Sequence, residues 1–169
     1  MDKIFIDCGY YVGKVHEIYR EAGILDDTWT VHAFEANPQL DIPDWVERKA
    51  VWTEDGEVTF QIGGRHDASS IQGTSGHGEP ELVTVPSFDF SKWISELPDA
   101  YILCSMDIEG AEFPVLRKML EENTINKINY LDVEFHHRLM EKEDSNDARD
   151  IIRQLLNRGV GVRIKVPLE

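Results

Sequence analysis

Acidic and histidine side chains gather at two points of the sequence where chemistry could take place. Three carboxylates lie within the six residues Asp107-Ile108-Glu109-Gly110-Ala111-Glu112, at a predicted junction between a strand and a helix. The next predicted strand ends in Asp132-Val133-Glu134-Phe135-His136-His137, where alternation puts Glu134 and His136 on one face. On neighbouring strands, these atoms could hold a divalent metal ion, supply a general base or form a satisfied polar cluster. For Glu112, capping of the helix N-terminus is an equally good interpretation.

A glycine-rich turn near the start of the chain indicates binding of a nucleoside-containing cofactor. An apolar run ends in Asp7-Cys8-Gly9-Tyr10-Tyr11-Val12-Gly13, and apolar residues follow at helical spacing. Glycine has no Cβ, so such a turn lets a ligand approach the backbone closely. The next apolar run, 30–34, ends in Glu35, whose carboxylate could accept both hydroxyls of a ribose. The spacing Asp-x-Gly-x-x-x-Gly differs from the phosphate-binding P-loop and from the Gly-x-Gly-x-x-Gly of nicotinamide-binding turns.

Strand-like and helix-like segments alternate along the chain, which favours an α/β sheet in one domain, residues 1–169. Predicted strands cover 3–8, 30–35, 48–53, 82–86, 101–107, 128–135 and 160–166, and predicted helices cover 13–23, 88–97, 111–122 and 145–158. Since the carboxyl ends of parallel strands meet at one edge of a sheet, this order would bring the acidic segments and the glycine-rich turn together.

Three connections in this scheme are unusual. The stretch between Glu35 and Glu47 is too short for a full helix with its turns, so we expect an abbreviated crossover there. Asp55-Gly56 predicts a tight hairpin turn after the third strand, with alternating apolar residues over 58–62 on its far side. The glycine- and serine-rich segment 63–80 has no period, and it is either a substrate-facing lid or a connector.

The composition restricts the partners and the cellular location. Seventeen Lys and Arg face 32 Asp and Glu, which gives a net charge of −15. A field of that sign repels nucleic acid and anionic membrane surfaces, so we expect neither as a partner. Cys8 and Cys104 fall near the ends of core strands and are expected to be a buried, reduced pair. The chain enters a strand at once and has no membrane-length apolar run, so a cytoplasmic location is expected.

In combination, these segments resemble the FkbM family of S-adenosylmethionine-dependent methyltransferases. The first motif, residues 7–13, is similar to the family's Asp-x-Gly-Ala-Asn-x-Gly, with Tyr10-Tyr11 in place of Ala-Asn. Phe34-Glu35-Ala36-Asn37-Pro38 resembles Phe-Glu-Pro-Asn-Pro. The segment 106–112 is close to the family's most distinctive string, Ile-Asp-Val-Glu-Gly-Ala-Glu. The motifs follow one another in order over most of the chain, which makes the set specific.

The resemblance implies a Rossmann-like class I methyltransferase sheet with flanking helices, in a trimmed version. It implies S-adenosylmethionine as cofactor, S-adenosylhomocysteine as product, and O-methylation of a hydroxyl on a saccharide or small-molecule acceptor. A divalent metal ion could bind as well, but none is predicted. The cofactor-binding residues it implies are Asp7, Gly9, Tyr11, Gly13, Glu35, Ala36, Ser70 and Asp107, and the catalytic residues are Asp107, Glu109 and His136. For the general base, Asp107 is preferred over His136.

Two other functions stay open at this point. The chain could be a metal-assisted hydrolase that uses Asp107, Glu109, Glu134 and His136. It could also be a module that binds the cofactor without catalysis and serves in regulation or assembly. A homodimer is a further expectation, because a short chain with exposed sheet edges can pair with a second copy.

Overall fold

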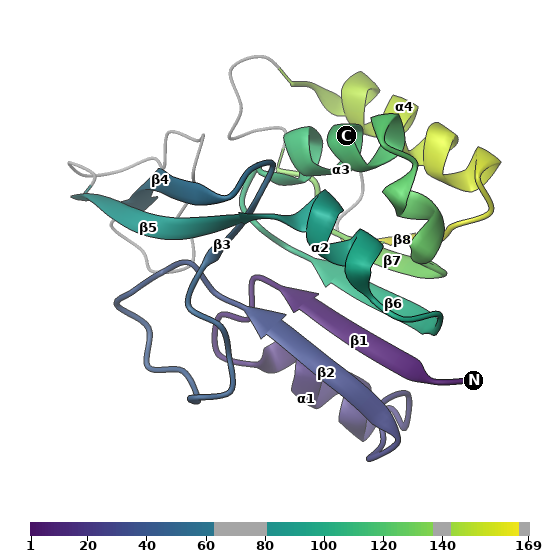
Figure 1. The fold of residues 1–169 in the computed structure, drawn as a ribbon, viewed down its shortest axis with the longest axis horizontal. Helices are drawn as coiled ribbons and strands as arrows, with labels where there is room; N and C mark the ends of the chain where they lie inside the picture. Colours follow the sequence, from purple (N-terminus) through teal and green to yellow (C-terminus); the bar gives the residue numbers. More distant parts are fainter. Residues whose placement is uncertain (63–80, 137–142, 166–169) are drawn as a thin grey trace.

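A five-stranded parallel sheet forms the centre of the protein (Figure 1). The computed structural model describes residues 1–62, 81–136 and 143–165. The strands of this sheet, in spatial order, are β2 (Trp29–Phe34), β1 (Lys3–Cys8), β6 (Tyr101–Met106), β7 (Tyr130–Val133) and β8 (Gly161–Ile164). Every neighbouring pair is parallel. The predicted α/β class is therefore confirmed.

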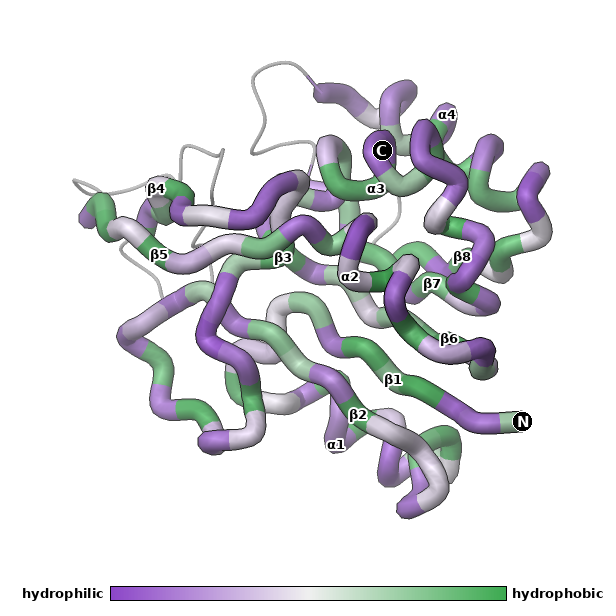
Figure 2. The backbone as a smooth tube through the Cα atoms, in the orientation of Figure 1, coloured by the Kyte–Doolittle hydropathy of each residue, from purple (hydrophilic) through white to green (hydrophobic). Residues whose placement is uncertain are grey.

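Helices cover both faces of this sheet, which is why its strands read as nearly continuous apolar runs (Figure 2). On one face lies α1 (Lys14–Glu21), which closes a small cluster around Phe5, Tyr19 and Leu103. The other face carries α2 (Phe90–Glu96), α3 (Glu112–Glu121), the 3-10 helix η1 (Thr124–Lys127) and α4 (Ser145–Asn157). In the described ranges, no helix is both long and apolar enough to cross a membrane.

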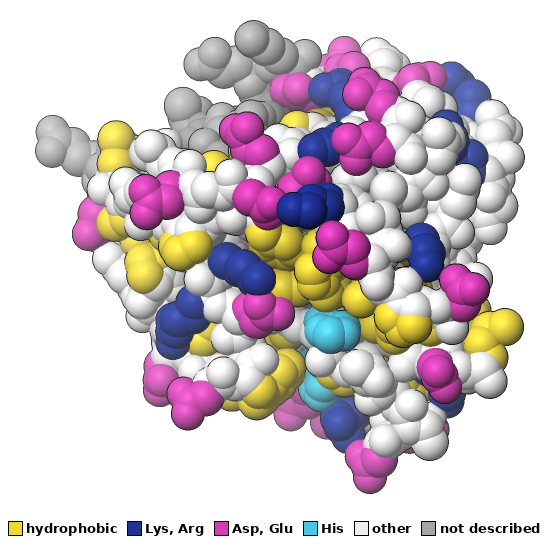
Figure 3. Space-filling view, in the orientation of Figure 1, with side chains coloured by type: hydrophobic (Ala, Val, Ile, Leu, Met, Phe, Trp, Pro, Cys, Tyr) yellow, Lys and Arg dark blue, Asp and Glu magenta, His cyan; other side chains and the backbone are white. Residues whose placement is uncertain are grey.

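The larger core lies between the sheet and α2, α3 and α4. Alternate residues of β1 and β6, such as Ile6 and Ile102, point into it and are fully buried. Cys8 and Cys104 also lie there as free thiols with their sulfurs 4.0 Å apart, as predicted. Outside the core, charged side chains surround the apolar ones visible near the middle of the face in Figure 3.

A second, three-stranded sheet corrects the prediction of a hairpin at Asp55-Gly56. It consists of β3 (Ala50–Trp52), β5 (Glu81–Asp89) and β4 (Gly56–Ile62), in that spatial order. β5 lies between the two strands that the turn connects, parallel to β3 and antiparallel to β4. The chain does turn there, but the Asp55 carboxylate accepts hydrogen bonds from the Asp89 N–H (3.1 Å) and from Lys92 Nζ (3.0 Å). The turn is thus anchored to the end of β5, and no hairpin forms.

The crossover after β2 contains no helix, which confirms the predicted abbreviation. Its end forms a parallel bridge with the end of β2, in which the Glu47 N–H donates to the Ala33 carbonyl (2.9 Å) and the Glu35 N–H donates to the Glu47 carbonyl (3.0 Å). Ile42 and Val46 pack with Ala33 in a small apolar cluster of their own. The segment 35–49 consequently lies at the carboxyl end of β2, beside the second sheet.

The connections of β1 and β6 leave the sheet on opposite faces. α1 follows β1 on one face and α3 follows β6 on the other, so an opening forms where these adjacent strands end. The two turns touch at Gly9, which has φ +89°. A Cβ added to Gly9 would lie 1.9 Å from the Asp107 carbonyl oxygen. The Asp107 N–H also donates to the Cys8 carbonyl (2.9 Å), so the two turns are locked together.

A row of polar residues crosses the buried α1 face of the sheet. The strand register places Asp7, Ser105, Asp132 and Arg163 side by side on β1, β6, β7 and β8. Asp132 is fully buried, and its carboxylate accepts from Arg163 Nε (2.9 Å) and from the Tyr19 hydroxyl. Asp7 Oδ2 has no hydrogen-bond partner among the described residues. Burial raises the pKa of Asp7 from 3.8 to about 7, although Lys165 opposes the rise.

The contact at Gly9 predicts a large loss of stability for Gly9→Ala. The new methyl group would collide with backbone rather than with a flexible side chain, at a positive φ. We expect the free energy of unfolding, measured by urea titration, to fall by about 2–4 kcal/mol. Gly23→Ala is the matched control, because Gly23 has φ +70° and no atom within 4 Å of its added Cβ. Equal losses in the two variants would contradict the proposed contact.

The buried Asp7 carboxyl predicts a pH-dependent effect of Asp7→Asn. Its pKa is higher in the folded protein than in the unfolded chain, so ionisation of Asp7 lowers stability as the pH rises from about 4 to about 7. The gain in unfolding free energy from Asp7→Asn should therefore be larger at pH 8.5 than at pH 4.5, by on the order of 2–4 kcal/mol. Asp41→Asn, at an exposed position, should show no such difference. A pH-independent effect of Asp7→Asn would disprove the assignment.

Candidate active site

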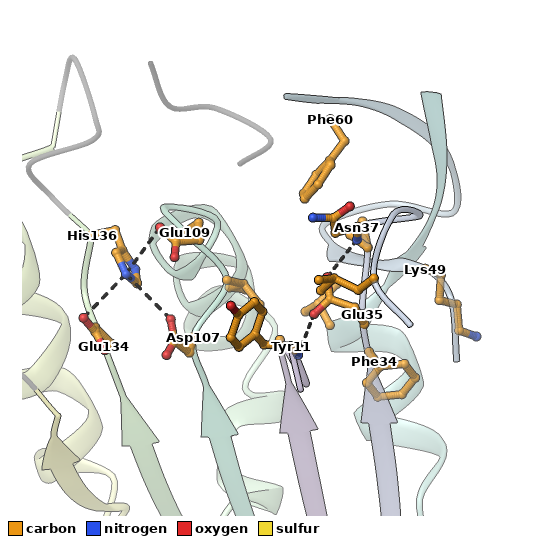
Figure 4. A pocket seen from close by; sticks show the side chains of 16 residues that line it. Tyr11, Phe34, Glu35, Asn37, Lys49, Phe60, Asp107, Glu109, Glu134 and His136 are labelled. Carbon is orange, nitrogen blue, oxygen red and sulfur yellow. Dashed lines mark hydrogen bonds and ion pairs between the residues drawn. The ribbon is translucent and has the colours of Figure 1, made fainter. Parts of the chain in front are cut away.

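A cavity of about 280 Å³ opens at the carboxyl edge of the central sheet (Figure 4). Its walls come from the turns after β1, β2, β6 and β7, from segment 35–49, and from β3 and β4. The strands point towards it in Figure 4, with Glu35 on one side and the cluster around His136 on the other. It lies where the connections of β1 and β6 diverge, which is the usual place for ligands in open α/β sheets.

Glu35 is held rigidly at one wall of the cavity. It is 8% exposed, Oε2 accepts from the Tyr11 N–H (2.7 Å), and Oε1 accepts from the Asn37 N–H (2.7 Å). Burial raises the pKa of Glu35, while these backbone hydrogen bonds lower it. A carboxylate has about four acceptor positions, so the Glu35 side chain can still accept a hydrogen bond from a ligand hydroxyl beside its backbone partners Tyr11, Asn37 and Ala36.

Apolar side chains that the sequence did not predict as site residues line the cavity next to Glu35. Phe34, Leu40 and Phe60 come from three separate segments, and Figure 4 shows Phe60 above Glu35. Lys49 also lines this wall, and its Nζ lies 4.6 Å from the centre of the Phe88 ring. The alternation around Phe60 predicted a strand, but it carried no signal for the sheet to which that strand belongs. Asn37 could have been found from its place in the motif that contains Glu35.

Two residues without glycine's freedom adopt a left-handed conformation beside the cavity. Tyr11 has φ +53° and Glu109 has φ +54°. Such values are uncommon outside glycine, asparagine and aspartate, and strained residues of this kind gather at functional sites. At Tyr11 the conformation aims the N–H at Glu35. The tyrosine stands where the resembled family motif has asparagine, a residue that adopts this conformation more readily.

His136 lies at the centre of a group of carboxylates on the opposite wall. Its Nε2 is 3.6 Å from Asp107 Oδ1, 3.5 Å from Glu109 Oε2 and 3.6 Å from Glu134 Oε1. These groups come from the ends of β6 and β7, which are adjacent strands. The predicted convergence of the two acidic segments is thus confirmed, as is the placement of Glu134 and His136 on one face.

Glu112 supports this cluster from the protein interior. Its carboxylate is completely buried and accepts from the N–H groups of Ile108 and Gly110, both at 2.8 Å. Glu112 does lie in the first turn of α3, where its charge complements the helix N-terminus, but these two N–H groups belong to the preceding turn and no described side chain caps the helix through a hydrogen bond. The same carboxylate also contacts His136 Nδ1 at 2.9 Å, which fixes the orientation of the ring. Its distance in sequence from His136 gave no sign of this second role.

The crowded carboxylates change the protonation behaviour of the cluster. Burial raises the pKa of Glu109 to about 7, and the neighbouring carboxylates add to the rise while His136 opposes it. Burial lowers the pKa of His136, but the hydrogen bond to Glu112 and the surrounding carboxylates outweigh burial and raise it to about 9. Lys165 Nζ, 3.5 Å from Asp107 Oδ2, adds a cation at the edge that the sequence did not indicate as part of the site.

Most of the predicted site residues meet at this cavity. Those that line it are Gly9, Tyr11, Glu35, Ala36, Asp107, Glu109 and His136. Asp7 lies beneath the turn in the buried polar row, and Gly13 begins α1 against the Tyr10 ring, so neither lines the cavity. Ser70 and the surrounding segment 63–80 lie outside the described residues. The binding and catalytic roles of all the predicted site residues stay predictions, including those of Asp7, Gly13 and Ser70.

Comparison with known proteins gives one finding that agrees with this geometry. No curated protein and no solved structure was found to match the chain. The family model of the methyltransferase FkbM domain matches residues 7–160, which include both walls of the cavity, the end of β1, and the whole of β2, β6 and β7. The chain therefore belongs to the FkbM methyltransferase domain family.

Proposed function

We propose that this protein transfers a methyl group from S-adenosylmethionine to a hydroxyl of a saccharide or another small molecule. The observation that carries the proposal is that a single cavity has Glu35 on one wall and a cluster of proton acceptors on the other (Figure 4). Membership of the FkbM methyltransferase family supports the reaction class. It also favours a methyltransferase over the metal-assisted hydrolase.

The wall around Glu35 fits a nucleoside-containing cofactor. Glu35 would accept hydrogen bonds from the ribose, because its two oxygens are oriented by Tyr11 and Asn37 and the carboxylate keeps acceptor capacity for a hydroxyl. The nearby apolar residues Phe34, Leu40 and Phe60 would pack against the adenine. Gly9 lines the cavity with backbone alone, which lets the methionine part come close. When bound, S-adenosylmethionine supplies an electrophilic methyl group on a sulfonium.

The opposite wall would orient the acceptor and take its proton. Asp107 is the favoured proton acceptor, since its side chain is 31% exposed, against 21% for Glu109 and 14% for His136. Its two oxygens face His136 Nε2 (3.6 Å) and Lys165 Nζ (3.5 Å), and these two groups hold the carboxylate in place. A hydroxyl that donates to Asp107 would present its oxygen to the cavity, where an aligned approach is needed for displacement.

The proposed role of Glu35 predicts a loss of cofactor binding in Glu35→Ala. Loss of hydrogen bonds to a charged group should weaken S-adenosylhomocysteine binding by roughly tenfold or more, measured by calorimetry. Glu35→Gln keeps the size of the side chain and one acceptor oxygen. It therefore separates the hydrogen bonds that Glu35 accepts from the backbone from its proposed contact with the ribose. Glu57→Ala, at an exposed position on β4, is the control. If Glu35→Ala binds as tightly as the parent, the ribose assignment is wrong.

The proposed role of Asp107 predicts a defect in turnover rather than in cofactor binding. We expect a panel of saccharide and small-molecule alcohols, incubated with S-adenosylmethionine, to contain an acceptor that gains an O-methyl group detectable by mass spectrometry. Asp107→Asn should lower kcat for that acceptor by roughly 10²–10⁴-fold and leave S-adenosylhomocysteine binding intact.

The exposed Asp99→Asn should behave like the parent in the same assay. Cofactor binding without transfer to any alcohol would count against this function and favour a non-catalytic module. Unchanged turnover in Asp107→Asn would exclude Asp107 as the proton acceptor.

A further inference from the structure

The cluster around His136 has a geometry that hydrogen bonding alone does not explain. Three carboxylate oxygens, from Asp107, Glu109 and Glu134, lie 3.5–3.6 Å from the single atom Nε2. Charge-assisted hydrogen bonds between nitrogen and oxygen are about 2.7–2.9 Å long. A proton on Nε2 would be expected to draw one carboxylate to such a distance. Instead, the three oxygens surround the nitrogen almost equally.

The same separations suit ligands that share one metal ion. Ligand atoms about 2.1 Å from a tetrahedral centre are about 3.4 Å apart, and those of an octahedral centre about 3.0 Å. One ligand atom each from Asp107, Glu109 and His136 lies within 4.8 Å of the other two. Glu134 does not belong to this set, although it borders the same nitrogen. A small inward movement of three side chains would complete a coordination shell.

Glu112 prepares the histidine for this role. Histidine ligands of metals commonly donate their other ring N–H to a carboxylate, which fixes the tautomer. Here the fully buried Glu112 lies 2.9 Å from Nδ1, and two backbone N–H groups hold it in place. With the proton on Nδ1, the lone pair of Nε2 faces the oxygens of Asp107 and Glu109. A metal ion that takes the place of a proton on Nε2 would lie between this nitrogen and those oxygens.

The local negative charge also favours a bound cation. Four carboxylates converge here, and among the described side chains in contact with Asp107, Lys165 is the one permanent cation. Each carboxylate is at most 31% exposed, so water screens their repulsion poorly. A doubly charged ion would offset much of this repulsion.

We propose that Asp107, Glu109 and His136 bind one divalent first-row metal ion such as Mn²⁺, with Glu112 orienting His136. One imidazole nitrogen and carboxylate oxygens suit ions of this class. Three protein ligands leave coordination positions open, as catalytic metal sites do, and these positions face the cavity. This step rests on the proposed methyl transfer: an acceptor hydroxyl bound to the metal ion would lose its proton more readily to the second oxygen of Asp107, which Lys165 also contacts.

The test is a titration of the full chain with Mn²⁺ in the absence of nucleoside, followed by electron paramagnetic resonance of free Mn²⁺ and by calorimetry. We expect one saturable site per chain. His136→Gln and Glu109→Gln should each weaken binding at least tenfold, and Glu112→Gln by roughly 10–100-fold. Glu96→Gln, on the exposed side of α2, should bind Mn²⁺ like the parent.

Absence of saturable binding, or unchanged binding in folded His136→Gln and Glu109→Gln, would overturn the proposal. Circular dichroism confirms folding, and Glu109→Gln keeps the test decisive if His136→Gln does not fold, because Glu109 is more exposed. S-adenosylhomocysteine binding is measured on the same samples. Cofactor binding without Mn²⁺ binding would rule out the proposed metal site and leave the proposed methyl transfer in place. Mn²⁺ binding without cofactor binding would support the metal site and rule out S-adenosylmethionine as the cofactor.

Discussion

The site depends on the direct contact between two backbone turns, at Gly9 after β1 and at Asp107 after β6. A side chain at Gly9 would occupy the position of the Asp107 carbonyl oxygen. With glycine there, the Asp107 N–H reaches the Cys8 carbonyl, and the Gly9 N–H reaches the Phe34 carbonyl (3.0 Å). The ends of β2, β1 and β6 are therefore tied into one edge. Because the connections of β1 and β6 leave on opposite faces, that edge stays open as a cavity.

On this fixed edge, the protein concentrates charge that is costly to bury. Asp7, Asp132 and Glu112 have almost no exposed surface. Asp132 is paired with Arg163, and Glu112 is hydrogen-bonded to two backbone N–H groups and His136, so their burial is compensated. Asp7 lacks a partner for one oxygen, and burial shifts its pKa upwards. Of these three groups, Glu112 contacts the cavity wall directly, through its hydrogen bond with His136.

The sequence predicted the central architecture well because its signals there are local. Strand-length apolar runs over 3–8 and 101–107 mark strands that are buried on both faces, and the parallel order follows from the helices between them. It failed at Asp55-Gly56, where a turn signal gave the change of direction but not the pairing. β5, far along the chain, inserts between β3 and β4, and a local dipeptide carries no information about such a long-range partner.

For this protein, the residue types and their order determined the family, the parallel sheet, the glycine turn and the meeting of Asp107, Glu109 and His136 at one edge. Strand alternation and sheet topology are sufficient for that conclusion. Only the tertiary structure decided that Glu112 orients His136, that Lys165 reaches Asp107, and that Phe60 and Leu40 complete the wall beside Glu35. These contacts join segments whose spacing in the chain has no period, so they follow from packing in three dimensions rather than from any pattern along the sequence.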